Sequence, residues 1–160
     1  SNVDDLDRLR EIQLGLLEVA SRFTVIFPAH PRTRARLAKL RRLGGRGKAS
    51  AMLTSPKSYI ETLALLKNAS CLLTDSGGMQ KEAFLLHVPC VTLRDSTEWP
   101  ETLVGRANRL VTEPKRIPGA VRDASSDETL RRKIRHFRSH FGDGHASNRI
   151  AKIIEKTFGR

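Results

Sequence analysis

Short apolar segments alternate with longer amphipathic ones along this chain, and this alternation constrains the fold more than any other feature. The short segments are predicted strands, and the longer ones, in which apolar residues recur at steps of three and four, are predicted helices. The predicted strands span residues 23–28, 49–53, 71–74, 90–93 and 108–112. The predicted helices span residues 3–20, 31–43, 55–70, 78–87, 127–140 and 145–158, and Asn2 or Asp4 is expected to cap the first.

Strands that alternate with helices predict βαβ units, in which consecutive strands run parallel and helices cover both faces of the sheet. Because such crossovers are right-handed, the chain is expected to form an α/β fold with a doubly wound, Rossmann-like parallel sheet. We expect residues 1–160 to form one such domain. Ligands of these sheets bind beyond the carboxyl ends of the strands, so the residues after 23–28, 71–74 and 90–93 are the candidates.

The composition is that of a globular protein, with 160 residues of which 39% are hydrophobic and 29% charged. No apolar run approaches the ~20 residues that cross a bilayer, and the polar, acidic start gives no sign of a secretory signal. Cys71 and Cys90 each begin an apolar run, so we expect buried free thiols in strands. Free thiols favour a reducing compartment and a cytoplasmic location.

The charge balance raises the question of nucleic-acid binding, because 29 basic and 17 acidic residues give a net charge of +12. Aromatic residues make up only 5% of the chain, so the side chains that stack on bases are scarce. The basic residues are also scattered, with runs at 32–48 and 130–140. A basic nucleic-acid-binding module is therefore the least favoured reading. The excess of positive charge exceeds what a small phosphorylated ligand needs.

The turn at residues 74–78 (Thr-Asp-Ser-Gly-Gly) is the main candidate site, since it follows a predicted strand and opens a predicted helix. Gly77 and Gly78 have no Cβ and let a ligand approach the backbone, and unpaired N–H groups of a first helical turn suit a phosphate. Ser76 can donate its hydroxyl, and Glu82, about one turn later, can accept from a ribose diol. The alternative is a plain turn in which Ser76 only caps the helix.

A second group follows the predicted strand at 90–93. Arg94 lies at its carboxyl end, and Glu98 and Glu101 come shortly after, so these carboxylates are either acid/base groups or, more commonly, helix caps and a surface ion pair. Lys57, near the start of the helix at 55–70, is within reach of the same cleft or simply exposed.

The histidines give no strong signal. His30 lies between two prolines after a strand, and packing on the helix start is favoured over a ligand role. His136 and His140 have helical spacing but no carboxylate or thiol partner, so no metal is expected. A G-x-G-x-x-G fingerprint does not occur, which disfavours nicotinamide binding, and no cofactor is expected.

Several segments together resemble the carboxyl-terminal half of the non-hydrolysing UDP-N-acetylglucosamine 2-epimerases. They are "VIFPAHPRTRARL" (25–37), "LTDSGGMQKEA" (73–83), "LRDSTEWPET" (93–102) and "GDGHASNRIAKII" (142–154). The resemblance spans nearly the whole chain. It implies the two-domain fold of the B-type glycosyltransferases (GT-B), with a UDP-sugar between two Rossmann-like domains. This chain would then be the carboxyl-terminal domain, and the family's acid/base carboxylates and "HR-x-x-N" segment would lie outside it.

The resemblance also implies roles for single residues. The residues matching Ser76, Gly77 and Gly78 hold the diphosphate in that family, and the one matching Glu82 holds the ribose. The positions matching Lys57 and Thr62 lie beside the uracil, but both carry other residue types in the best-known members, which indicates contact through the backbone.

The family's "TERPE" reads "TEWPE" here, so Trp99 stands where an arginine helps to hold the phosphates. Arg94 or Lys57 is a candidate to compensate.

The function that the resemblance implies is inversion at C2 of a UDP-sugar, by elimination and re-addition of UDP, with no metal or nicotinamide. UDP-N-acetylglucosamine is the first expected substrate, and "QKEA" with "TEWPE" leans toward UDP-diacetamido-glucuronic acids. The chain alone is expected to be inactive. Its expected partners are a UDP-sugar, the amino-terminal domain and a second copy in a homodimer, with no membrane. The donor half of a GT-B glycosyltransferase is the alternative enzyme.

Overall fold

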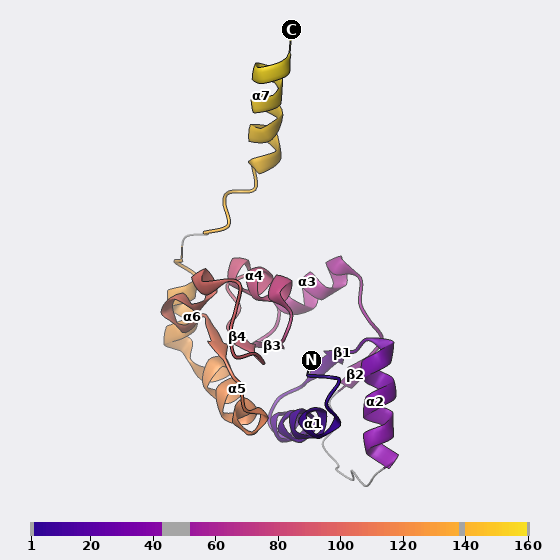
Figure 1. Ribbon diagram of the computed structural model, residues 1–160. Coiled ribbons are helices and arrows are strands. Elements are labelled where there is room, and N and C mark those ends of the chain that lie inside the picture. The colour runs from indigo at the N-terminus through magenta and orange to yellow at the C-terminus, as the bar shows by residue number, and fades with distance from the viewer. Residues whose placement is uncertain (1, 43–51, 138–139, 160) are drawn as a thin grey trace.

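The computed structural model describes residues 2–42, 52–137 and 140–159, and Figure 1 shows how their helices and strands are arranged. The strands are β1 (Ile26–Pro28), β2 (Met52–Thr54), β3 (Leu72–Thr74), β4 (Cys90–Thr92) and β5 (Asn108–Leu110). The α-helices are α1 (Leu6–Ala20), α2 (Pro31–Arg42), α3 (Tyr59–Lys67), α4 (Gly77–Leu85), α5 (Ile117–Ser126), α6 (Glu128–Ile134) and α7 (Ala146–Phe158). Two short 3₁₀ segments are η1 (Pro100–Arg106) and η2 (Pro114–Arg116).

All strand pairs of the described residues are parallel, which confirms the predicted α/β class. The strands form two sheets, one with the order β1-β2 and one with the order β3-β4-β5. Phe27 pairs with Leu53 in the first sheet, and Val91 of β4 lies between Leu73 and Arg109 in the second. The single sheet expected from the sequence is therefore divided between β1 and β3, and helices surround both parts (Figure 1).

Helix α1 follows the predicted pattern, since Leu9, Ile12 and Val19 are buried on one face. Its cap differs from the prediction. Asp5 caps the helix, because its Oδ1 accepts from the backbone N–H groups of Asp7 (2.9 Å) and Arg8 (3.1 Å). A carboxylate there satisfies donors that have no partner within the helix.

Helix α3 begins four residues later than predicted, because Ser58 and Glu61 form a capping box. Ser58 Oγ accepts from the Glu61 N–H, and the Glu61 carboxylate accepts from the Ser58 N–H at 2.8 Å. These two hydrogen bonds fix the start of the helix after Pro56. Leu66 is buried, whereas Tyr59, the first residue of the helix, is 63% exposed.

The main hydrophobic core joins α1 and α5 to β4 and the segment after β5. Its buried members are Ile12, Val19, Val91, Leu93, Val111, Ile117, Val121 and Ala124. A second cluster links α3 and α4 to β4, and a third links α4 to α6. Val91 of β4 is fully buried, so β4 is the central strand of its sheet.

Some elements of the structure differ from the predictions, and some predictions fall outside the described residues. Helix α5 has no counterpart among the predictions, although Ile117, Val121 and Ala124 give it a buried stripe and its proline lies near its start, where proline is tolerated. The predicted helix at 127–140 ends at Ile134 in the structure. The predicted loop at 44–48 lies outside the described residues, as does most of the predicted strand at 49–53, whose last two residues belong to β2.

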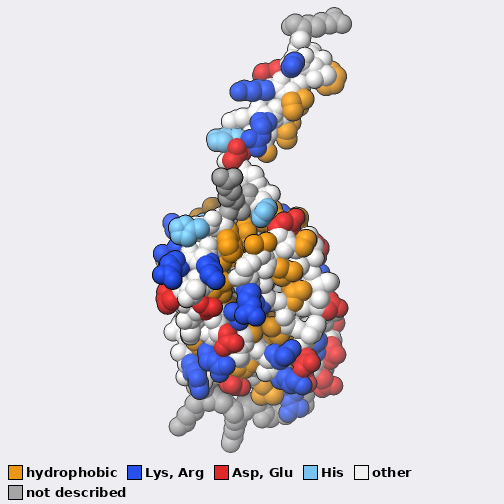
Figure 2. All heavy atoms as spheres, turned by 90° about the vertical axis from the view of Figure 1, so that its left-hand side faces the viewer, with side chains coloured by type: hydrophobic (Ala, Val, Ile, Leu, Met, Phe, Trp, Pro, Cys, Tyr) orange, Lys and Arg blue, Asp and Glu red, His pale blue; other side chains and the backbone are white. Residues whose placement is uncertain are grey.

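Helix α7 projects away from the rest of the molecule (Figure 1). Its apolar side chains line one side, as Figure 2 shows, and all are exposed, up to 78% for Phe158. The helix is amphipathic, yet its apolar side contacts no core in the described residues. Within the described ranges, no helix has the length and apolar character needed to span a bilayer.

Both cysteines are free thiols, as expected. Cys90 lies in β4, while Cys71 immediately precedes β3. Burial raises the pKa of each thiol to about 12, and the neighbouring thiol of Cys90 adds to the shift at Cys71. Both are therefore protonated at neutral pH and serve as small apolar side chains.

Candidate functional site

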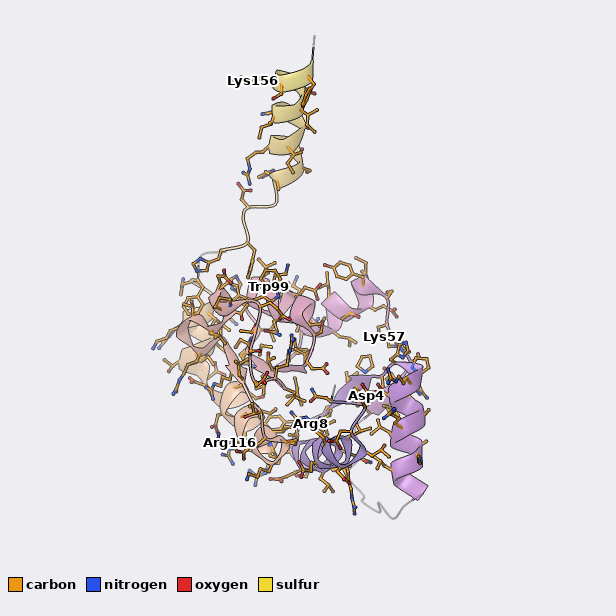
Figure 3. The ribbon with its side chains drawn as sticks, in the orientation of Figure 1. Asp4, Arg8, Lys57, Trp99, Arg116 and Lys156 are labelled. Atoms are coloured by element: carbon orange, nitrogen blue, oxygen red, sulfur yellow. The ribbon has the colours of Figure 1, made fainter. Side chains whose placement is uncertain are left out.

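Three of the predicted site residues lie just beyond the carboxyl ends of strands in the two sheets. Lys57 comes after β2, Ser76 after β3 and Arg94 after β4. The same amino-terminal segment, residues 2–5, borders both edges. Beside β4, Asn2 Nδ2 donates to Leu93 O at 2.9 Å. Beside β1, Arg36 Nη1 of α2 donates to Asp4 O at 2.7 Å. The carboxyl edges of both sheets therefore lie at one end of the molecule, near Asp4 in Figure 3.

The amino-terminal turn of α4 has the form expected for an anion site. Ser76 is its N-cap, with Oγ accepting from Met79 N at 3.5 Å, and Ser76 N donates to Thr74 Oγ1 at 3.1 Å. Gly77 and Gly78 are the first two residues of the helix. The N–H groups of a first turn have no partner within the helix and carry the positive end of its dipole. Ser76 thus caps the helix, and its contact with a phosphate stays a prediction.

The two glycines differ in what surrounds them. A Cβ added at Gly77 would lie 3.2 Å from Glu98 Oε2 and 3.4 Å from Trp99 Nε1, so these side chains cover that side of the helix tip. A Cβ added at Gly78 would meet only Ser76 Oγ, at 3.9 Å. The tip of α4 is therefore covered over Gly77 and open over Gly78.

Glu98 and Arg94 form an ion pair beside this tip. Arg94 Nη1 donates to both carboxylate oxygens of Glu98, at 2.7 and 2.9 Å. The backbone N–H of Glu98 and then the Arg94 guanidinium lower the pKa of the Glu98 carboxyl, whose side chain is 54% exposed. A negative charge near a helix amino terminus is stabilised there. An incoming phosphate at Gly77 would therefore compete with Glu98 for the helix end and for Arg94.

The indole of Trp99 is held between α4 and the segment after α6. Lys81 Nζ lies 3.9 Å from the centre of the Trp99 ring, a cation–π arrangement, and the Phe141 ring meets Trp99 edge-on at 5.9 Å between centroids. The Lys81 side chain thus brings a positive charge to the same side of α4. Figure 3 shows Trp99 in the upper part of the body and Lys57 to its right.

A buried network of polar side chains supports the loop that carries Glu98. Gln80 Oε1 accepts from Thr97 Oγ1 at 2.6 Å and from Asn108 Nδ2 at 3.1 Å. Asn108 Nδ2 also donates to Thr102 Oγ1 at 3.0 Å, and Asn108 Oδ1 accepts from Thr92 Oγ1 at 2.7 Å. The sequence analysis missed these residues, and their only signal is polar character inside otherwise apolar elements.

The remaining predicted residues lie apart from the tip of α4. Glu82 is half-buried on that helix, one turn beyond Gly78. Thr62 Oγ1 donates to Ser58 O at 2.9 Å, and Lys57 helps, after Ser58, to lower the pKa of Glu61. Among the described residues, no hydrogen bond or ion pair joins Lys57 or Thr62 to residues 76–82.

His30 directly precedes α2 and is exposed, rather than packed on the start of that helix as the favoured interpretation had it. Its Nδ1 accepts from the Arg32 backbone N–H at 3.3 Å. In the part of the chain that the structure describes, no three His, Cys, Asp or Glu side chains gather as a metal-binding group would require.

A family model described as UDP-N-acetylglucosamine 2-epimerase matches residues 1–155 of this chain. The chain belongs to this family. The resemblance drawn from the segments at 73–83 and 93–102 is thereby confirmed.

Curated relatives cover nearly all of the chain. A UDP-N-acetylglucosamine 2-epimerase of Methanocaldococcus jannaschii is 39% identical over 99% of this chain and 42% of its own length. A UDP-2,3-diacetamido-2,3-dideoxy-D-glucuronate 2-epimerase of Pseudomonas aeruginosa is 40% identical over 97% of this chain and 42% of its own length. This epimerase-family chain thus spans less than half the length of these relatives.

Solved structures of the family share its fold. The crystal structure of the M. jannaschii enzyme in complex with UDP-GlcNAc and UDP aligns with a TM-score of 0.79, at 38% identity, over 97% of this chain and 42% of that one. The Neisseria meningitidis enzyme bound to UDP-GlcNAc aligns with a TM-score of 0.72, at 28% identity, over 92% of this chain and 41% of that one. The α/β fold of this epimerase-family chain is therefore that of the corresponding part of these enzymes.

Proposed function

We propose that this chain is the UDP-binding half of a UDP-sugar 2-epimerase and that the tip of α4 binds the diphosphate. The observation that carries the proposal is a helix that opens with Gly77 and Gly78 directly behind β3 and is uncovered over Gly78. Unpaired backbone N–H groups at such a tip favour an anion. Membership of the epimerase family supports a nucleotide sugar as that anion.

The proposed contacts follow the order of groups in a UDP-sugar. Ser76, Gly77 and Gly78 take the diphosphate, with backbone N–H groups as donors. Glu82, one turn along the same helix, takes the ribose hydroxyls. The uracil lies near Lys57, two residues before the neighbouring helix α3, and near Thr62, in its first turn.

Arg94 is proposed as the side chain that compensates for the tryptophan at position 99. Its guanidinium already lies beside the tip through its ion pair with Glu98. In the proposed complex Arg94 exchanges this carboxylate for a phosphate oxygen, and the two-pronged guanidinium suits both acceptors.

The proposed reaction is inversion at C2 of the sugar, by elimination and re-addition of UDP. In that reaction this half of the enzyme binds and orients the substrate, which lowers the entropic part of the barrier. We assign no acid or base role to Glu98, because its carboxylate is engaged with Arg94. We assign none to Glu101 either, because the family resemblance places the acid/base carboxylates outside this chain.

The proposed partners are a further domain that completes the site and a second copy in a homodimer. Free thiols support a cytoplasmic location.

The sugar is the least determined part of the proposal. UDP-N-acetylglucosamine is favoured because the matching family model and the M. jannaschii relative carry that name. The P. aeruginosa relative supports a UDP-diacetamido-glucuronic acid as the substrate, and its sequence identity to this chain, 40%, is about the same as that of the M. jannaschii relative. Assaying both UDP-sugars in deuterated water, with a two-domain protein that contains this chain, would separate them. The true substrate gains deuterium at C2, whereas a glycosyltransferase would transfer the sugar without this exchange.

Replacing Gly78 by valine tests the diphosphate site. Gly78→Val is expected to weaken UDP binding about 10-fold or more, because branched methyl groups would occupy the space above the open tip of α4. The measurement is titration of UDP by calorimetry, with thermal unfolding in parallel. Gly119→Val is the matched control, since Gly119 is also a helical glycine in open space, with only Arg122 Nη2 near its added Cβ at 3.9 Å. Equal UDP affinities of wild type and Gly78→Val would overturn the site.

A further inference from the structure

Helix α6 and its carboxyl-terminal cap carry three arginines that line one hollow. Arg131, Arg132 and Arg135 border a space of about 270 Å³ together with Glu128 and Thr129, and we call this space the α6 hollow. Among the described residues, no ion pair includes Glu128 or any of the three arginines. The lining of the α6 hollow therefore has an excess of positive charge that the rest of the described chain does not balance by direct pairing.

The three guanidinium groups of the α6 hollow repel one another. Arg135 follows Arg131 by four positions and Arg132 by three, so these side chains are neighbours on one helical face, where like charges destabilise a helix. Cations are favoured near the carboxyl end of a helix, but that attraction does not require three of them to line one hollow. An anion between the guanidinium groups would turn this repulsion into attraction. Helices α5 and α6 lie on the left of the body in Figure 1, the side that faces the viewer in Figure 2, where Lys and Arg side chains are exposed.

Arg131 also reaches inward and leaves a buried donor unused. Its Nη2 donates to Ser70 O at 2.8 Å, just before β3, so the side chain is anchored on the sheet. Its Nε is buried and has no hydrogen-bond partner among the described residues, and the same is true of Nε of Arg109 in β5. Buried donors without a partner are rare in folded proteins, and a bound ligand is one of the few physical explanations for them.

The two arginines with buried Nε atoms lie near the same thiol. Burial and then the Cys90 thiol raise the pKa of Cys71, whereas the guanidinium groups of Arg109 and then Arg131 oppose this rise, so both act on one place. Both arginine side chains are half-buried, where salt screens a charge less than at the surface. Arg109 likewise belongs to no ion pair of the described residues. Arg109 therefore adds positive charge behind the α6 hollow, near the start of β3, whereas Ser76 follows the other end of that strand.

We propose that the α6 hollow binds a small dianionic oxyanion of the phosphate class, held by Arg131, Arg132 and Arg135. Each guanidinium presents parallel N–H donors that match two oxygens of a tetrahedral anion. A carboxylate has only two oxygens and cannot serve three guanidinium groups, so a phosphate group is favoured over an acidic side chain. A hollow of about 270 Å³ also has room for the organic part of a phosphate monoester. The proposal does not depend on UDP binding at the tip of α4.

Titration of the 160-residue chain with inorganic phosphate tests the α6 hollow, with sodium chloride used to hold the ionic strength constant. The Nε–H signal of Arg131 in ¹H–¹⁵N NMR spectra is expected to shift and to saturate with a Kd of about 1 mM. The double variant Arg132→Gln/Arg135→Gln is expected to weaken this binding at least about 10-fold. Its Tm without phosphate should stay within about 2 °C of the wild-type value, because both side chains are exposed. The backbone N–H of Gly78 reports on the tip of α4 in the same spectra, so the two anion sites are measured separately.

Arg122→Gln is the matched control, since it removes an exposed arginine of α5 that pairs with Asp123, and it should leave the affinity for phosphate unchanged. Saturation at Arg131 that the double variant loses and the control keeps supports the site. A shift that grows in proportion to phosphate without saturating, or equal affinities of the wild type and the double variant, would refute it. Shifts at Arg131 that require a short RNA duplex and do not occur with phosphate would also refute it, and would assign these arginines to a nucleic-acid backbone.

Discussion

Glu98 is the single residue whose charge most affects the proposed anion site. Its carboxylate lies beside Gly77 and engages Arg94. Glu98→Gln is expected to tighten UDP binding about 3-fold to 5-fold, because the change removes a like charge near the diphosphate and releases Arg94. Calorimetric titration at low and high salt measures this, and the gain is expected to shrink as salt screens the exposed charges.

A matched control separates the site from a general effect of charge. Glu113→Gln removes one negative charge from an exposed ion pair with Lys115, away from α4, and is expected to leave UDP affinity unchanged. If Glu98→Gln and Glu113→Gln change the affinity equally, or if neither does, Glu98 does not compete with the ligand.

Among the elements, α4, β4, β5 and η1 depend on one amide for their mutual placement. Asn108→Ala is expected to lower the free energy of unfolding by about 2–4 kcal/mol, because it removes three buried hydrogen bonds, one each to Gln80, Thr92 and Thr102. Urea denaturation followed by circular dichroism measures the loss. Asn68→Ala removes an exposed amide that bonds only Ala64 O within its own helix, and should cost far less. Similar losses for both variants would mean that the network contributes nothing beyond ordinary hydrogen bonds.

Sequence patterns predicted the elements whose causes are local. The spacing of Leu9, Ile12 and Val19 is sufficient to predict α1, and a serine before two glycines is sufficient to predict the start of α4. The failures involve partners far away in the chain. Asn2 or Asp4 is the predicted cap of α1, but Asn2 bonds Leu93 O, 91 residues later, and the cap is Asp5.

The same reason limits prediction of the site. Local chemistry identified the turn at Ser76, whereas the cover that Glu98 and Trp99 place over Gly77 arises from tertiary packing. The network between Gln80 and Asn108 joins residues 28 positions apart, and no spacing rule connects them. Thr62 was identified only through the family resemblance, as was the uracil role of Lys57, and the uracil contacts of both residues stay predictions.

At the scale of the whole molecule, α7 contributes little to the stability of the rest. All described side chains from Ala146 to Phe158 are exposed, and its links to the preceding loop are exposed ion-pair contacts between Arg149 and Asp143. Deleting residues 146–160 is therefore expected to change Tm by less than about 2 °C in calorimetry. Ile134→Ala in α6, where the side chain is buried, is the comparison and should lower Tm clearly. A large drop on deletion would mean that α7 packs against the body.

Pro28 has a consequence for how the molecule behaves in concentrated solution. It lies on the unpaired edge of β1, where its ring supplies no N–H, so that edge is a poor template for growth by intermolecular strand addition. In the described residues the second edge of β3 has no such protection, and the backbone N–H of Leu73 faces it. Aggregation during expression or storage should therefore begin at β3, and solubilising substitutions belong on that strand.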